Sequence, residues 1–140
     1  MPVTKMSDMW ATLQTYTTSG DKERPVNHLN EWGGFSRRLG MPVFTGWSDR
    51  TTFDKTTKET KALILGADWE SAPGRSNQEK WIRFAEEENE GRAAFFVIHA
   101  KDINAEPRKV ESISTDRVFI GSVIREAGDV YIVGRPQPLT

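Results

Sequence analysis

Large rings and arginines gather in one stretch of the chain, residues 32–53, which reads WGGFSRRLGMPVFTGWSDRTTF. It holds five aromatic residues, three arginines and four glycines, but only two aliphatic residues, Leu39 and Val43. Flat rings stack on bases, sugars and other planar ligands, and guanidinium groups neutralise phosphate or carboxylate. The predicted ligand site therefore has three stacking rings and three cations: Trp32, Phe35, Arg37, Arg38, Trp47 and Arg50.

A structural role explains the same stretch without a ligand. Trp32 and Phe44 then cover the edge of the core, and the arginines are solvated. Binding residues are concentrated on loops rather than on core strands, and this glycine-rich stretch matches neither a helical nor a strand period. If residues 32–53 do form a ligand site, the ligand suited to them is a nucleotide, a single-stranded or modified nucleic acid, or a small planar organic molecule.

His99 and Lys101 lie in a second stretch of chemical interest, the apolar strand Phe95-Phe-Val-Ile-His-Ala-Lys-Asp102. It resembles the hydrophobic-Glu-x-Lys strand of the PD-(D/E)xK nuclease superfamily. In that family the carboxylate binds Mg²⁺ and the lysine orients the attacking water, so the resemblance implies a small metal-dependent hydrolase. His99 stands at the position of the glutamate, Lys101 at that of the lysine, and Asp68 would be the upstream carboxylate. The other interpretation is a hydrogen-bonded histidine at the end of a core strand.

Other catalytic motifs are missing from the sequence. There is no Gly-x-Ser-x-Gly, no Walker-type phosphate loop and no Gly-x-Gly-x-x-Gly. Two distant histidines and no cysteine give no zinc-ligand spacing. We expect neither metal nor cofactor, and we favour a non-enzymatic binding module over the hydrolase. A self-associating accessory protein without a small ligand is the third alternative.

Helical periodicity appears mainly in the N-terminal half and once near the middle. Four apolar residues at helical spacing predict a helix over 5–16, and Pro25 followed by Gly33-Gly34 predicts a short helix over 25–32. The clearest helix is 77–90, which Ser76 and Glu79 would begin as a capping box and Gly91 would end. Glu79 and Arg83 are spaced to pair within it.

Strand patterns dominate the rest of the chain. Strands are expected at 61–67, 93–101, 108–113, 117–125 and 129–134, while 33–60 is expected to be irregular. The strand at 93–101 is apolar on both faces, which is typical of a central strand. We predict one α+β domain over residues 1–140. It would have two or three helices packed on a curved, mostly antiparallel sheet of five or six strands, with a partial barrel as a variant.

The last two expected strands are also apolar on both faces. We expect one face to carry Phe119, Val123, Tyr131 and Val133, and the other to carry Val118, Ile120, Ile124, Val130 and Ile132. One small core cannot easily cover both. The pattern predicts either a sheet that curls or a homodimer through the C-terminal sheet.

Composition sets the outer limits. The chain has 140 residues, a formal net charge of −1, 36% hydrophobic residues and no cysteine. These values exclude a disordered chain and a disulfide scaffold. Positive and negative side chains are balanced in both halves, which argues against a nonspecific nucleic-acid binder. No apolar run suits a signal peptide or a membrane span, so we expect no membrane partner and a cytoplasmic location.

Overall fold

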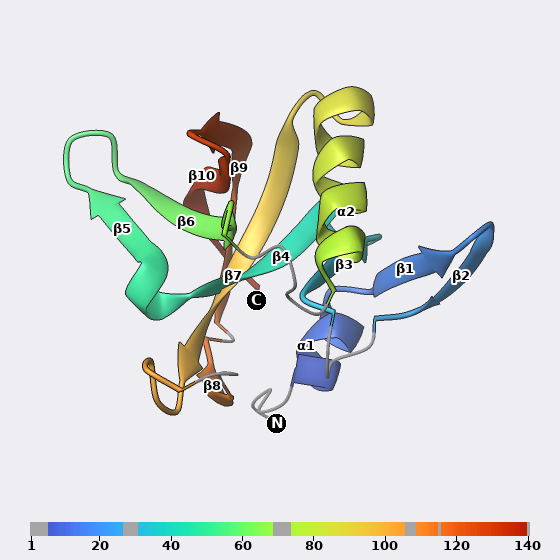
Figure 1. The fold of residues 1–140 in the computed structure, drawn as a ribbon, viewed down its shortest axis with the longest axis horizontal. Helices are drawn as coiled ribbons and strands as arrows, with labels where there is room; N and C mark the ends of the chain where they lie inside the picture. The colour runs from blue at the N-terminus through green and yellow to red at the C-terminus, as the bar shows by residue number, and fades with distance from the viewer. Residues whose placement is uncertain (1–5, 27–30, 69–73, 106–108, 115, 140) are drawn as a thin grey trace.

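The computed structural model describes residues 6–26, 31–68, 74–105, 109–114 and 116–139. Within these ranges the chain forms two α-helices, one 3-10 turn and a ten-stranded mixed sheet (Figure 1). The elements are α1 (Met6–Thr12), β1 (Thr15–Ser19), β2 (Lys22–Pro25), β3 (Gly33–Ser36), β4 (Met41–Trp47), η1 (Ser48–Arg50), β5 (Thr51–Asp54), β6 (Glu59–Leu65), α2 (Arg75–Glu88), β7 (Arg92–Ala100), β8 (Val110–Ile113), β9 (Arg117–Glu126) and β10 (Asp129–Pro138). Hydrogen bonds order the strands β2-β1-β3-β4-β7-β9-β10-β6-β5, and β8 pairs with β7.

The expected fold class is wrong in its balance of helix and sheet. Five or six strands carrying two or three helices were expected, but the described residues form ten strands, with β4 and β7 parallel. The helix expected at 5–16 ends at Thr12, because the residues after it pair as β1 with β2 and β3. Where a helix was expected at 25–32, β2 ends at Pro25; residues 27–30 lie outside the described ranges.

The segment 33–60, expected to be irregular, contributes β3, β4, β5 and the start of β6. Its glycines serve close packing within a strand. A Cβ on Gly33 would lie 2.5 Å from the Phe44 ring, and one on Gly34 would lie 2.5 Å from the carbonyl oxygen of Tyr16. These two glycines therefore allow β3 to fit between its neighbours.

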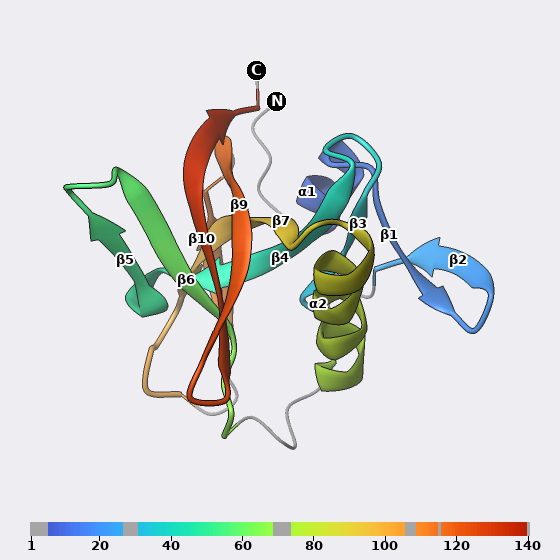
Figure 2. The ribbon, with the colours of Figure 1, turned by 90° about the horizontal axis from the view of Figure 1, so that it is seen from above.

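Two apolar cores lie on opposite faces of the central strands. On β7, Phe95 belongs to the core under α2, and Phe96 belongs to the core under α1. Figure 2 shows the two helices on opposite sides of β4. Because β7 lies between β4 and β9, it needs the two apolar faces that its sequence carries.

The sheet is strongly curved, so that β6, near one end of the strand order, packs against β4 in the middle. β4 continues through η1 into the edge strand β5, which pairs with β6. A Cβ on Gly46 of β4 would lie 3.1 Å from the Cβ of Ala62 on β6. The curvature leaves the β5–β6 hairpin projecting at one end of the molecule and the β1–β2 hairpin at the other (Figure 1).

The register of the β9–β10 hairpin corrects the expected face assignment. Val123 lies opposite Ile132, and Ile124 lies opposite Tyr131. Directly opposed residues share a face, so Val123 lies with Ile132 over the α2 core rather than with Tyr131. The other face carries half-buried apolar residues: Ile120, Ile124, Tyr131 and Val133.

The helix α2 forms almost where expected, with different ends. It is preceded by Gly74 at a φ of 78° with no side-chain cap, so the capping box of Ser76 and Glu79 is absent. Glu79 instead accepts a hydrogen bond from Arg75 at 2.8 Å, not from Arg83. Gly91, at a φ of 77°, closes the helix by donating its N–H to the Ala85 carbonyl at 2.7 Å. Neither described helix has the length and apolar character needed to cross a bilayer.

Candidate functional site

Phe35, the first of the predicted stacking rings, lies on the α2 face of the sheet. Its ring centroid is 6.0 Å from that of Trp81 and 5.6 Å from that of Phe84, and Tyr16 completes the cluster at 5.7 Å. These contacts attach α2 to β1 and β3. Phe35 therefore has a packing role that accounts for its position.

The predicted cations Arg37 and Arg38 contact protein groups. Arg37 forms an ion pair with Glu23, and its guanidinium carbon lies 4.3 Å from the centroid of the Tyr16 ring. The hydrogen bond to Glu23 raises the pKa of Arg37. Arg38 donates to the carbonyls of Thr12 and Leu139. Both side chains thus connect segments that are distant in the chain.

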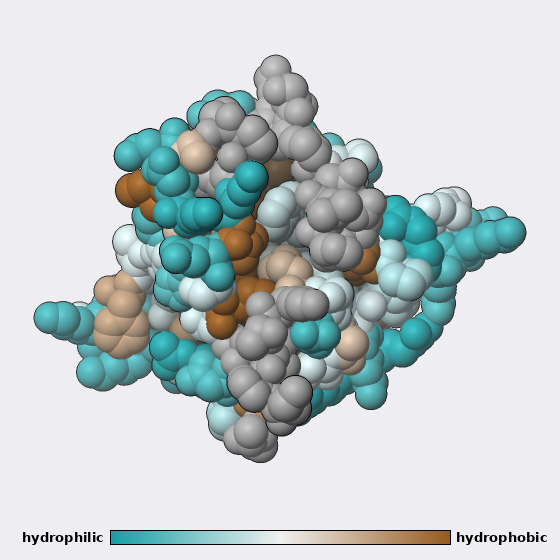
Figure 3. All heavy atoms as spheres, turned by 90° about the horizontal axis from the view of Figure 1, so that it is seen from below, coloured by the Kyte–Doolittle hydropathy of each residue, from teal (hydrophilic) through white to brown (hydrophobic). Residues whose placement is uncertain are grey.

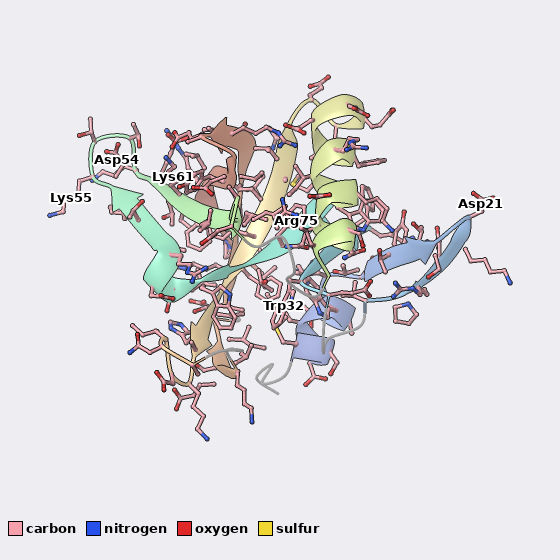
Figure 4. All side chains as sticks on the ribbon, viewed as in Figure 1. Asp21, Trp32, Asp54, Lys55, Lys61 and Arg75 are labelled. Atoms are coloured by element: carbon pink, nitrogen blue, oxygen red, sulfur yellow. The ribbon has the colours of Figure 1, made fainter. Side chains whose placement is uncertain are left out.

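Trp32 and Trp47 lie on the opposite face, beside the α1 core. Their ring centroids are 5.8 Å apart, and both rings are half-buried. Figure 4 places Trp32 near α1, far from the hairpin tip that carries Asp54 and Lys55. Arg50 follows in η1, also half-buried. The structure thus brings Trp32 and Trp47 together, but it separates them from Phe35 by the thickness of the sheet.

A groove beside the β5–β6 hairpin has a distinctive chemistry. It has a volume of about 780 Å³, within the range of small-molecule sites. Residues from β5, the β5–β6 turn, β6, β7, β9, β10 and the segment after β8 line it: Thr51, Phe53, Lys58, Thr60, Val97, His99, Ser114, Arg117, Phe119, Arg135, Pro136 and Gln137. None of the six residues predicted from sequence is among them.

The lining of this groove carries positive charge only. Lys58, Arg117 and Arg135 contribute three cations, and among the described residues no Asp or Glu lines the groove. Arg117 lies 5.2 Å from the centroid of the Phe119 ring, and Arg135 donates to the Thr57 carbonyl at 3.2 Å. In the part of the chain that the structure describes, none of these three cations forms an ion pair. Their charge is therefore available to a ligand.

His99 also lines the groove, through a pair with Ser114. Its Nε2 lies 3.2 Å from the Ser114 Oγ. Within the described ranges no carboxylate bonds to His99, so the pair lacks the third member of a catalytic triad. His99 is a groove residue with a hydroxyl partner.

Asp68 does not reach the other two residues of the nuclease-like alternative. The antiparallel pairs β7–β9, β9–β10 and β10–β6 make β6 run opposite to β7. Asp68, just after β6, therefore lies toward the start of β7, whereas His99 and Lys101 lie at its end, roughly 20 Å along the strand. Nowhere in the described residues do three or more potential His or carboxylate ligands gather around a metal position.

Comparison with family models, with curated proteins and with solved structures finds no match in any of the three.

The groove residues gave little local signal in the sequence. They come from five strands and two loops, and strand pairing alone brings Arg117 and Arg135 to the same hollow as Lys58. Phe53 was inside the suspected stretch but was not among the residues predicted for the site. The composition of the stretch instead led to Trp32 and Trp47 as predicted stacking residues, and in the structure both pack beside the α1 core.

Proposed function

We propose that this protein is a non-enzymatic binding module that holds a small anionic ligand in the groove beside the β5–β6 hairpin. The observation that carries the proposal is the lining, which in the described part of the chain has three cations outside any ion pair and no carboxylate. Like charges gathered in a partly enclosed hollow repel one another, and an anion relieves that repulsion. His99, Ser114 and Gln137 add hydrogen-bonding groups to the lining.

A small ligand fits the charge distribution better than a long nucleic acid. The whole chain has a net charge of −1, and acidic residues lie close to the groove, with Asp54 and Glu59 on the hairpin itself. A nonspecific nucleic-acid surface needs a broad basic excess for counterion release. Here the positive charge is confined to one hollow.

Calorimetric titration with inorganic pyrophosphate tests this proposal. Arg117→Gln and Arg135→Gln should each weaken binding about tenfold, the usual loss for one charge-assisted hydrogen bond. Arg92→Gln is the matched control: it makes the same charge change at an exposed position at the other end of β7, and should stay within about twofold of the parent. No pyrophosphate binding, or an equal loss in all three variants, would reject the groove.

Trp47→Ala separates the groove from the site predicted by sequence. Because Trp47 packs on the α1 face, its loss should leave pyrophosphate affinity unchanged. If Trp47→Ala abolished binding while Arg117→Gln did not, the aromatic and arginine-rich stretch would be the site instead.

Two further expectations stay proposals. Homodimerisation through the C-terminal sheet would use the outer face of β9 and β10, where Ile124, Tyr131 and Val133 are half-buried. Light scattering during size exclusion should then give twice the chain mass of 15.9 kDa, and a monomer at every concentration would reject the dimer. The cytoplasmic location stays a prediction as well.

A further inference from the structure

We propose that the ligand of this groove is a phosphate ester of a planar ring, such as a mononucleotide, with its ring stacked on Phe53. The inference rests on the proposed function, in which the cations of the groove bind the anionic part of a ligand. It adds the chemical class of the rest of that ligand, which the cations alone do not specify.

Phe53 is the side chain that carries this inference. It is 57% exposed, and Ile103 is the one other large apolar side chain described as exposed. It lies on the edge strand β5 opposite Thr60, and in the described residues no other ring contacts it. Figure 3 shows an apolar patch interrupting the polar surface of the projecting hairpin on which Phe53 lies. Leaving a phenyl ring in water forgoes the free energy of its burial, and a stacked ligand would restore part of it.

The other ring of the groove is already occupied by protein groups. Phe119 is 5% exposed and stacks on Phe95, with centroids 4.8 Å apart and planes 7° from parallel. The Arg117 guanidinium lies over the same ring. Phe53 is thus the aromatic surface that the groove offers to a ligand.

The charges and the ring are arranged at two sides of the hollow. Phe53 and Lys58 belong to the β5–β6 hairpin, while Arg117 and Arg135 come from β9 and β10. In the β9–β10 ladder Arg117 lies opposite Pro138, on the face that also carries Phe119, whereas Arg135 lies opposite Ile120 on the other face. Of these two lining residues, Arg117 is therefore the one on the face of Phe119, and a ligand that spans the groove can keep its ring on the hairpin and its phosphate at Arg117. An inorganic anion would occupy only the cationic side of the groove.

The test compares two ligands that share a phosphate and differ in the ring. Calorimetry should show adenosine monophosphate binding at least tenfold more tightly than ribose 5-phosphate. Phe53→Ala should weaken the mononucleotide by about 5- to 100-fold, as expected for one base stacked on one aromatic ring, and leave ribose 5-phosphate unchanged. Phe53→Trp should retain the preference. Ile103→Ala is the matched control for loss of an exposed apolar side chain, and should change neither affinity.

The outcomes separate this inference from the proposed function. Equal affinity for the two ligands, or equal losses in Phe53→Ala, would overturn the stacking inference and leave the anion site in place. Failure of pyrophosphate and both phosphate esters to bind would overturn the proposed function. Binding of a single-stranded oligonucleotide without binding of the mononucleotide would also overturn the inference. Because Phe53 is exposed on an edge strand, an unchanged thermal midpoint is expected and shows that the variants are folded.

Discussion

At the scale of single residues, small side chains decide how closely the strands approach. Gly121 on β9 lies directly opposite Gly134 on β10. A Cβ on Gly121 would overlap the Val133 carbonyl oxygen and lie 2.5 Å from the Gly134 Cα. These are backbone atoms, which cannot move aside as a flexible side chain can. The two strands meet here more tightly than any other residue would allow.

Gly121→Ala should therefore destabilise the protein strongly. The added methyl group must push β9 and β10 apart, and we expect a loss of about 3 kcal/mol in the free energy of unfolding, measured in urea. Ser122→Ala, at the exposed neighbouring position, should change it by less than about 0.5 kcal/mol. Similar effects from the two substitutions would contradict the close approach of the strands.

At the scale of elements, a buried polar network joins α2 to the sheet. Thr17 on β1 is fully buried, and its hydroxyl donates to the Asn77 Oδ1 at 2.6 Å and accepts from the Trp81 Nε1 at 2.9 Å. Asn77 in turn donates to the Gly33 carbonyl at 2.8 Å. The helix is thus held in register against β1 and β3 by hydrogen bonds inside an apolar contact, where few alternative partners exist.

Thr17→Val tests this network with almost no change in side-chain volume. It leaves the Trp81 N–H and the Asn77 oxygen without their partner, so we expect a loss of about 2–4 kcal/mol in unfolding free energy. Thr52→Val makes the same chemical change at an exposed position on β5 and should be nearly neutral. Equal effects of the two substitutions in urea unfolding would show that the buried hydrogen bonds contribute little.

At the scale of the whole molecule, two cores share the same strands. Phe44 and Phe95 face the α2 side, while Val43 and Phe96 face the α1 side. Neither core can lose its strands without exposing the other. The molecule should therefore unfold as one cooperative unit, as expected for a single domain of this length.

Methyl NMR in a urea titration measures this coupling. Met9 reports on the α1 core and Ile82 on the α2 core. Their folded signals should disappear at one common midpoint, and Phe96→Leu should lower both midpoints equally although it changes only the α1 side. Two separate midpoints would divide the chain into independent units and contradict the single-domain prediction.

The sequence predicted well those elements whose pattern is local. Met6, Met9, Trp10 and Leu13 form a buried stripe, as their helical spacing indicated. The helix around Trp81 and the strand around Phe95 are also present. By contrast, β1 and β3 are made of threonine, serine and glycine with one ring each, and their strand character comes from the partners they pair with. No local sequence pattern predicts such strands.

The candidate site was predicted less well for the same reason. A cluster of rings and arginines in the sequence indicated a surface, but the fold places Phe35 and Trp47 on opposite faces and uses both in packing. The groove cations are far apart in the chain, with Lys58 and Arg135 separated by 77 residues, the difference between their numbers. Composition can reveal residue types that suit a ligand, but it cannot reveal which of them converge.

The sequence by itself determined the two helices from their helical periodicity and the central strand from its two apolar faces, because each is a property of neighbouring residues. Its residue types alone excluded cysteine and the classical catalytic motifs. The ten-strand order, the curvature and the cationic groove depend on contacts between distant segments. Those contacts form because burying Phe95, Phe96 and Trp81 stabilises one arrangement of the whole sheet. Lys58, Arg117 and Arg135 meet at the groove as a consequence of that burial, which is why only the tertiary structure could show them together.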